Sequence, residues 1–330
     1  MKNIRGIISA NLIWLAFLVL CNFSAKAQQY ALVLHGGAGV ISRDRMSKDA
    51  EAKYRAKLNE ALMLGDSLLK AGATCTDVVM EVIKVMEDSP LFNAGKGAVF
   101  TNKGTNELDA SIMEGRTLNA GAVAAVTHIK NPIVAAREVM DHSEHVLLSG
   151  KGAGEFARKQ GLKMVSRRYF YTKSRYESLK QLKKQERRRE QKDNIGTVGC
   201  AVLDKYGNLA AGTSTGGMTN KKFGRIGDSP IIGAGTYADN KTCAISCTGY
   251  GEYYIRLSFA RDVSALMEYK GLSVDGACRE EIRKLTALGG DGGVIAIDKK
   301  GNIATEFNTS GMFRGYIKSS GEKEIAIFAR

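Results

Sequence analysis

Histidine is scarce in this sequence of 330 residues: there are four, all in the first half of the chain, at His35, His128, His142 and His145. Their positions exclude an α/β-hydrolase nucleophile elbow at the literal G-x-S-x-G of 212–216, because that elbow needs a histidine later in the chain. A serine triad that used an upstream histidine has little else in the sequence to support it.

Cysteine is also sparse, and its odd number argues against a disulfide framework. Six are present, and setting aside Cys21 in an expected leader leaves Cys75, Cys200, Cys243, Cys247 and Cys278. Five cysteines in an exported protein are poor support for paired bridges. No histidine lies near Cys243 and Cys247, so a zinc site is not expected. We therefore expect buried free thiols.

The first 27 residues have the pattern of a secretory signal peptide. A positive start (Lys2, Arg5) precedes an apolar run at 7–20 and an A-x-A cleavage site at 25–27. The run is short for a membrane span. A lipoprotein reading through Cys21 is weaker, because a bulky leucine precedes that cysteine. We expect an exported protein, in the periplasm, with no stable membrane span.

The composition is that of a globular protein, yet its positive charge is concentrated in one segment. Hydrophobic residues make up 44% and charged residues 25%, which excludes collagen-like, coiled-coil and wholly disordered chains. The formal net charge is +14, and residues 158–192 hold fourteen basic residues against three acidic ones. No aromatic residue interrupts 180–192 to stack on bases. We expect a solvated, mobile linker over 158–196 rather than a nucleic-acid or membrane patch.

Hydrophobic periodicity predicts strands and helices in one layered domain. An apolar run at 30–34 predicts a strand that enters a glycine-rich loop at 35–39. That loop is either a backbone nest for an anion or a purely structural turn. Two apolar runs each lead through a D-K-x-G-N turn into a return strand, which predicts hairpins and antiparallel sheet. Helical spacing occurs over 50–72, 76–88, 131–148 and 252–269. The predicted class is α+β and not doubly wound.

The junction at 193–199 is the most informative feature of the second half. A polar linker meets a buried strand at the bond between Gly196 and Thr197. A threonine hydroxyl is a weak nucleophile unless a base lies beside it, and an N-terminal threonine carries that base as its own α-amine. The reference pKa of an α-amine, about 7.7–8.0, suits this role. Gly196 would tolerate the backbone strain of an N→O acyl shift.

Seven separate motifs, in order, resemble the plant-type L-asparaginases, also called isoaspartyl or β-aspartyl peptidases, which are N-terminal-nucleophile hydrolases. The resemblance runs from about Tyr30 to about Gly315. The motifs are HGGAG at 35–39, PLFNAG at 90–95, ELDA at 107–110, GTVG at 196–199, TSTGGMTN at 213–220, GRIGDSP at 224–230 and CTGYGE at 247–252.

The resemblance implies a four-layer αββα sandwich and a precursor that cuts itself between Gly196 and Thr197. The products would be an α chain of 28–196 and a β chain of 197–330, paired as a dimer of αβ units. Thr197 would be the nucleophile. The other implied roles are positioning by Thr215, an oxyanion hole from the Thr248 hydroxyl and the Gly249 N–H, and substrate binding by Arg225, Asp228 and Gly251.

The resemblance also implies a structural sodium ion and no catalytic cofactor. Asn93 would support the active site, and the ion would bind the backbone carbonyls of Met86, Glu87, Ser89, Phe92, Ala94 and Lys96. From the residues alone two alternatives stay open. Arg225 and Asp228 could form an internal salt bridge, and Thr215 and Thr248 could be ordinary turn hydroxyls.

The expected activity is hydrolysis of β-aspartyl peptides and of the side-chain amide of L-asparagine, releasing L-aspartate. Arg225 offers a planar fork for the substrate α-carboxylate and Asp228 a charge for its α-ammonium. A glycosylasparaginase-like amidase is a related alternative. A non-catalytic exported binding protein acting through its basic linker is a different one. The expected partner is a small-molecule or dipeptide substrate, with no nucleic acid.

Overall fold

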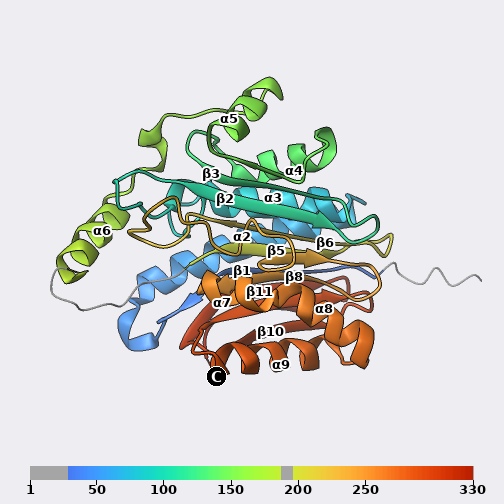
Figure 1. Cartoon of the computed structure of the whole chain (residues 1–330). Helices are drawn as coiled ribbons and strands as arrows, with labels where there is room; N and C mark the ends of the chain where they lie inside the picture. The colour runs from blue at the N-terminus through green and yellow to red at the C-terminus, as the bar shows by residue number, and fades with distance from the viewer. Residues whose placement is uncertain (1–28, 187–195, 330) are drawn as a thin grey trace, which may run out of the picture.

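Two β-sheets form the centre of the computed structural model, which describes residues 29–186 and 196–329. The expected leader and residues 187–195 lie outside this part of the chain. The larger sheet has the strand order β12-β11-β1-β5-β6-β2-β3-β4 (Figure 1). Its strands are β1 (Ala31–Gly39), β2 (Leu108–Glu114), β3 (Ala120–Val126), β4 (Leu147–Ser149), β5 (Val198–Leu203), β6 (Leu209–Thr215), β11 (Gly311–Lys318) and β12 (Lys323–Phe328). The smaller sheet has the order β10-β9-β8-β7, built from β7 (Thr236–Ala238), β8 (Cys243–Gly249), β9 (Gly292–Asp298) and β10 (Ile303–Phe307).

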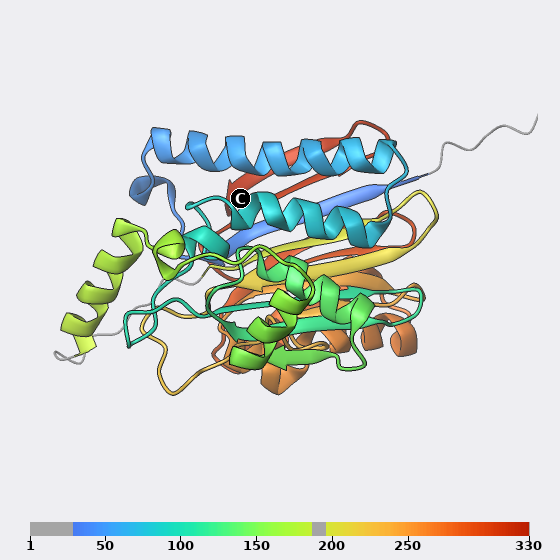
Figure 2. The ribbon, with the colours of Figure 1, turned by 90° about the horizontal axis from the view of Figure 1, so that it is seen from above.

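Alternation along the strands separates the two faces of the larger sheet. In β1, Leu32 and Leu34 point to a core shared with helices, and Ala31 and Val33 point to a second core. Two long helices, α2 (Lys48–Lys70) and α3 (Cys75–Glu87), lie side by side over the first face (Figure 2). Each begins at a hydroxyl residue that accepts a backbone N–H, Ser47 and Thr74 respectively. The same face carries α4 (Pro132–His142) and α5 (Gly150–Lys159).

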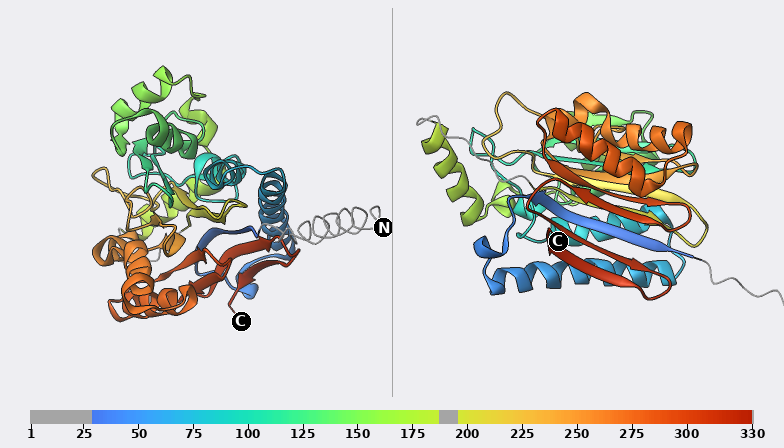
Figure 3. Two further views of the ribbon diagram at one scale, coloured as in Figure 1. Left: turned by 90° about the vertical axis from the view of Figure 1, so that its right-hand side faces the viewer. Right: turned by 90° about the horizontal axis from the view of Figure 1, so that it is seen from below.

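The smaller sheet is covered on its outer face by helices from the C-terminal half. These are α7 (Gly251–Leu257), α8 (Phe259–Lys270) and α9 (Val274–Ala287), the orange helices of Figure 3. The inner face of this sheet meets the larger sheet. Small and branched side chains of both sheets fill the space between them, among them Ala201, Ala244 and Ile295. The chain is therefore an α+β protein, as the hairpins predicted.

Several predicted elements differ in extent from the observed ones. The glycine-rich segment 35–39 is part of β1, with a register shift between His35 and Gly37 where the strand pairs with β11. The predicted helix 131–148 ends at His142, and β4 follows it. The predicted helix 252–269 is broken at Ser258, which has a φ of 49° and separates α7 from α8. Both predicted hairpins, β5–β6 and β9–β10, are confirmed.

The basic segment is more ordered than a solvated linker. It contains the end of α5, a 3-10 helix at Arg167–Phe170, and α6 (Lys173–Glu186), which stands at one side of the molecule (Figure 1). Phe170 and Leu179 are buried, and Arg175 donates hydrogen bonds to the carbonyls of Gly97 and Leu91. The expectation of a mobile linker therefore does not describe residues 158–186. In the described residues no helix is long and apolar enough to cross a membrane.

Candidate active site

The two-residue period of the strands directs three of the predicted threonines into the space between the sheets. Thr197 precedes β5 and shares the face of Ala201, whose side chain lies in the inter-sheet core. Thr215 ends β6 on the face of Ala211, and Thr248 lies near the end of β8 on the face of Ala244. Both hydroxyls lie on strands, so the alternative that they are turn hydroxyls does not hold. All three residues are buried.

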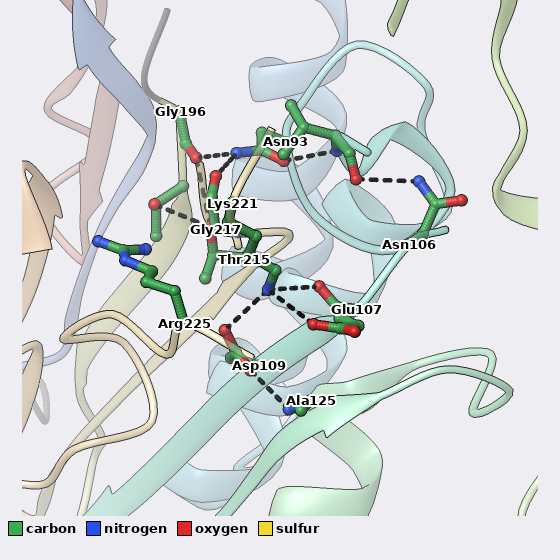
Figure 4. A network of polar contacts seen from close by, with 12 residues as sticks. Asn93, Asn106, Glu107, Asp109, Ala125, Gly196, Thr215, Gly217, Lys221 and Arg225 are labelled. Carbon is green, nitrogen blue, oxygen red and sulfur yellow. Dashed lines mark hydrogen bonds and ion pairs between the residues drawn. The ribbon is translucent and has the colours of Figure 1, made fainter. Parts of the chain in front are cut away.

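The hydroxyls of Thr197 and Thr215 contact each other directly at the predicted cleavage bond. Thr197 Oγ1 donates to Thr215 Oγ1 at 3.1 Å. Thr215 Oγ1 in turn reaches the Gly196 carbonyl oxygen at 3.4 Å and accepts the Gly217 N–H at 3.0 Å (Figure 4). Thr215 therefore contacts both the predicted nucleophile and the carbonyl group that this nucleophile would attack during self-cleavage.

Asn93 holds that same carbonyl from the other side. Its Nδ2 donates to the Gly196 oxygen and to the Gly217 oxygen, both at 2.7 Å. Its Oδ1 accepts the Val99 N–H at 2.9 Å, which fixes the orientation of the amide (Figure 4). The predicted supporting residue thus contacts the Gly196–Thr197 bond itself.

The glycine-rich part of β1 packs closely on Thr197. Gly37 has a φ of +111°, and a Cβ there would lie 2.9 Å from Gly196 Cα and 3.1 Å from the Thr197 nitrogen. The next residue donates its N–H to the Thr248 hydroxyl, from Ala38 N to Thr248 Oγ1 at 3.4 Å. Because that hydroxyl accepts one hydrogen bond, its own hydrogen is available to an oxygen in the space between the sheets.

The backbone at the predicted oxyanion hole is fixed by packing. Gly249 has a φ of +154°, and a side chain there would overlap the Asp291 carbonyl. The buried Tyr254 hydroxyl lies 3.1 Å from the Thr248 carbonyl oxygen and 3.2 Å from that of Gly293. The end of β8 is therefore held rigidly, as electrostatic stabilisation of a developing oxyanion requires.

Asp228 is buried, and one of its oxygens has no hydrogen-bond partner among the residues that the structure describes. Its side chain lies in the loop between β6 and β7, and the residue is 5% exposed. The oxygen without a partner is Oδ2. Burial raises the pKa of this carboxyl to about 7, although the nearby Arg225 acts in the opposite direction. A Cβ on Gly251 would lie 2.7 Å from Asp228 Oδ1 and 2.8 Å from Arg225 Nη2, so glycine is needed between the two.

The ion pair of Arg225 is made with Glu252 and not with Asp228. Arg225 Nε and Nη2 reach the two oxygens of Glu252, each at 2.9 Å. Burial lowers the pKa of the guanidinium, but the hydrogen bonds to Glu252 leave it raised. The side chain of Arg225 is 18% exposed and that of Glu252 47%. A substrate carboxylate would have to replace this bidentate contact.

Sequence reasoning did not single out Glu252 or the charged group below the site. Lys221 Nζ is buried, 3.1 Å from the Glu107 carbonyl oxygen and 3.7 Å from Asp109 Oδ2 (Figure 4). Asp109 Oδ1 accepts the Ala125 N–H at 2.7 Å. Lys221 directly follows the motif 213–220 and Asp109 lies inside another motif, so the sequence marked both positions. Nothing in the sequence indicated that the two side chains lie close together.

The loop after α3 brings several carbonyls together around two glycines. A side chain on Gly95 would overlap the Glu87 carbonyl oxygen, and one on Gly97 would overlap that of Phe92. The Ala94 carbonyl accepts the Gly97 N–H at 3.1 Å, which leaves it a second lone pair, whereas the Met86 carbonyl accepts the N–H groups of both Asp88 and Ser89. Oxygen ligands of this kind fit a hard cation. Among the described residues no group of three or more His, Cys, Asp and Glu side chains could hold a metal.

Comparison with known proteins shows the family of this chain. Residues 28–327 match the family described as asparaginase. The chain is 51% identical over 294 residues to the isoaspartyl peptidase of Escherichia coli, covering 86% of this chain and 92% of that protein. It is 43% identical over 325 residues to a probable isoaspartyl peptidase/L-asparaginase 2 of Arabidopsis thaliana (91% and 99%). It is 41% identical over 313 residues to the plant-type L-asparaginase of Pyrococcus horikoshii (90% and 99%). The chain belongs to the asparaginase family.

Proposed function

We propose that this protein is an autoprocessed threonine hydrolase that cleaves β-aspartyl (isoaspartyl) peptides and the side-chain amide of L-asparagine to release L-aspartate. The observation that carries the proposal is the position of Thr197: its hydroxyl is buried beside Thr215, at a Gly–Thr bond whose carbonyl is held by Asn93. The names of the relatives, isoaspartyl peptidase and L-asparaginase, support the choice of substrate.

Self-cleavage would begin with attack of Thr197 Oγ1 on the Gly196 carbonyl carbon. Asn93 Nδ2 and Thr215 Oγ1 already point at the oxygen on which negative charge develops. The C–N bond breaks, the Thr197 nitrogen takes a proton and becomes an α-amine, and Gly196 is left as an ester on the threonine oxygen. Water then hydrolyses the ester, which frees Gly196 as a carboxylate.

In the mature enzyme the new α-amine would act as the base for its own hydroxyl. The substrate would present its α-ammonium to Asp228, whose Oδ2 has no partner in the described part of the chain, and its α-carboxylate to Arg225. These contacts aim the β-carbonyl carbon at Thr197, with its oxygen at the Thr248 hydroxyl and the Gly249 N–H. Loss of the amine or ammonia gives a β-aspartyl ester, and water releases L-aspartate.

The larger assembly is part of the same proposal. Helices on the outer faces of two sheets that share a core support a four-layer αββα sandwich of the N-terminal-nucleophile type. One domain would contain an α chain of 28–196 and a β chain of 197–330, with two αβ units paired as a dimer. The carbonyls of 86–96 would hold a structural sodium ion that keeps Asn93 in place. The leader would direct the protein to the periplasm.

Intact mass spectrometry tests the central step. The wild-type protein should give two chains, one beginning Thr197-Val198-Gly199, and should release L-aspartate from L-asparagine and from β-aspartyl dipeptides. Thr197→Ala should give one uncut, inactive chain, while Thr117→Ala, an exposed turn variant, should behave as wild type. An active Thr197→Ala protein would refute the proposal and favour a site elsewhere.

A further inference from the structure

A chain of five buried polar side chains crosses the space between the sheets and ends on the carbonyl of Thr197. From the far end, Ser111 Oγ contacts Thr236 Oγ1 at 2.8 Å, and Thr236 donates to Thr213 Oγ1 at 2.6 Å. Thr213 and Ser246 Oγ are 2.6 Å apart, and Ser246 is 3.0 Å from His35 Nε2. The other ring nitrogen of His35 lies 3.1 Å from the Thr197 oxygen.

The last contact fixes the direction of every hydrogen bond back to Thr213. A carbonyl oxygen only accepts, so His35 Nδ1 must carry the hydrogen. The imidazole is completely buried, which lowers its pKa to about 3, so it is neutral and Nε2 accepts from the Ser246 hydroxyl. Ser246 has then donated its one hydrogen, so at 2.6 Å it accepts from Thr213. One tautomer of His35 satisfies this arrangement.

This polar chain is built into the fold. His35, Ser246, Thr213, Thr236 and Ser111 are each 0% exposed, beside an apolar core of alanine, valine, leucine, isoleucine and methionine. A side chain on Gly199 would overlap both Ser246 Oγ and His35 Nε2. An apolar replacement of such a chain is often neutral or stabilising, so packing alone does not account for it.

We propose that His35, held by the Ser246 hydroxyl at Nε2 with its Nδ1–H directed at the Thr197 carbonyl, is a positioning residue for Thr197 in the hydrolase reaction. The proposal rests on the proposed function, since it assumes that Thr197 is the nucleophile. It assigns to His35 no contact with substrate. The role is to fix the peptide plane between Thr197 and Val198, and with it the Cα from which both the hydroxyl and the α-amine project.

The need for such a contact arises when the 196–197 bond is cut. In the intact chain Thr197 is held on both sides, because Asn93 anchors the Gly196 carbonyl. After cleavage Thr197 is a chain end, and its carbonyl is its first remaining backbone anchor. A small rotation there would move the amine away from the hydroxyl that it must deprotonate, and misplacement of reacting groups is costly in rate.

Two variants of His35 separate the two sides of the ring. The amide nitrogen of His35→Asn can take the place of Nδ1 and donate to Thr197, whereas His35→Gln reaches towards Ser246 and loses that donor. Ser246→Ala keeps the ring but removes the hydroxyl that donates to Nε2. Rates should be expressed per Thr197 N-terminus, counted by intact mass, so that slower self-cleavage is not mistaken for slower turnover.

We expect kcat to fall about tenfold in His35→Gln and in Ser246→Ala, with KM within about twofold of wild type, and His35→Asn to retain more activity than His35→Gln. A purely structural role would lower folding stability without this order of kcat values. In nitrogen-15 NMR of labelled histidine, the ring signal that His35→Asn removes from those of the four histidines should be that of a neutral Nδ1–H ring. Ser246→Ala should change that signal.

Two results would overturn the inference. One is an Nε2–H tautomer at His35, and the other is a kcat for His35→Gln equal to that of wild type. Its failure is distinguishable from failure of the proposed function. If Thr197→Ala stays inactive while the His35 variants turn over normally, only the positioning role is lost. If Thr197→Ala is active, the proposed function itself fails.

Discussion

Replacing Asp228 by asparagine should make the protein more stable and almost inactive. The pKa of Asp228 is raised by burial from 3.8 to about 7. The folded state therefore binds a proton at this carboxyl more tightly than the unfolded state does, and wild-type stability falls as the pH rises from about 4 through 7. Asparagine has a similar shape and carries no charge, so it avoids this cost.

The size of the effect follows from the two pKa values, 3.8 and about 7. Each pH unit between them contributes about 1.4 kcal/mol. Asp228→Asn should therefore raise the free energy of unfolding by about 4 kcal/mol at pH 8 and about 2 kcal/mol at pH 5.5. The difference should disappear below about pH 3, where the wild-type carboxyl is largely protonated in both the folded and the unfolded state.

The measurement needs a single chain, because a cut protein does not unfold in one unimolecular step. Both proteins would therefore carry Thr197→Ala, and urea unfolding would be followed by circular dichroism at pH 5.5 and pH 8. An equal difference at the two pH values would refute the reasoning, since it would mean that Asp228 does not titrate between them. An asparagine variant that is less stable at pH 8 would refute it as well.

The same carboxyl should contribute to the acid side of the activity profile, together with the Thr197 α-amine. Only the ionised form of Asp228 can hold the substrate α-ammonium, so kcat/KM should fall as the pH drops below about 7. In an otherwise wild-type protein, Asp228→Asn should lower kcat/KM by at least about a hundredfold, because a buried charged partner is lost. Its residual activity should lose the part of this fall that Asp228 causes and keep the part that protonation of the Thr197 α-amine causes.

Two further predictions concern contacts beside the substrate. Glu252→Gln should lower KM about two- to fivefold, because half-exposed Glu252 no longer competes with the substrate carboxylate for Arg225; initial-rate kinetics would measure this, and a higher KM would contradict competition. Asn93→Ala should slow self-cleavage about a hundredfold or more, because the Gly196 oxygen loses a donor. Its matched control is Asn106→Ala, whose amide binds the Ala98 and Val99 carbonyls at 3.0 Å and does not touch Gly196. Gel electrophoresis over time follows the uncut chain, and equal rates in the two variants would refute the role of Asn93.

Local pattern was enough to predict much of the scaffold. The turns at 204–208 and 298–302 predicted both hairpins, because such a turn between two short apolar runs is typical of a β-hairpin. The apolar run after Thr197 predicted a buried strand, and the alternation within it decides which side chains face the second sheet. The sequence therefore indicated which face of the strand these residues occupy, but not which residues they contact.

Contacts between distant segments could not be predicted in the same way. His35 and Ser246 are 211 positions apart, and only the pairing of two sheets brings them together. Arg225 could have paired with Asp228 three positions away, but the start of α7 places Glu252 in bidentate range. The basic composition of 158–186 masked Phe170 and Leu179, whose burial holds that segment on the domain.

The strand order determines how the two chains of the cut protein can separate and refold. β1 belongs to the segment before Gly196, and it lies between β11 and β5, which both come after Thr197. β2, from the first segment, pairs with β6 from the second. Once the bond is cut, the two chains stay interleaved within one sheet and cannot separate without breaking three strand pairings. Folding before the cut is unimolecular, but refolding after it is a meeting of two chains, so recovery from denaturant should depend on protein concentration after the cut and not before it.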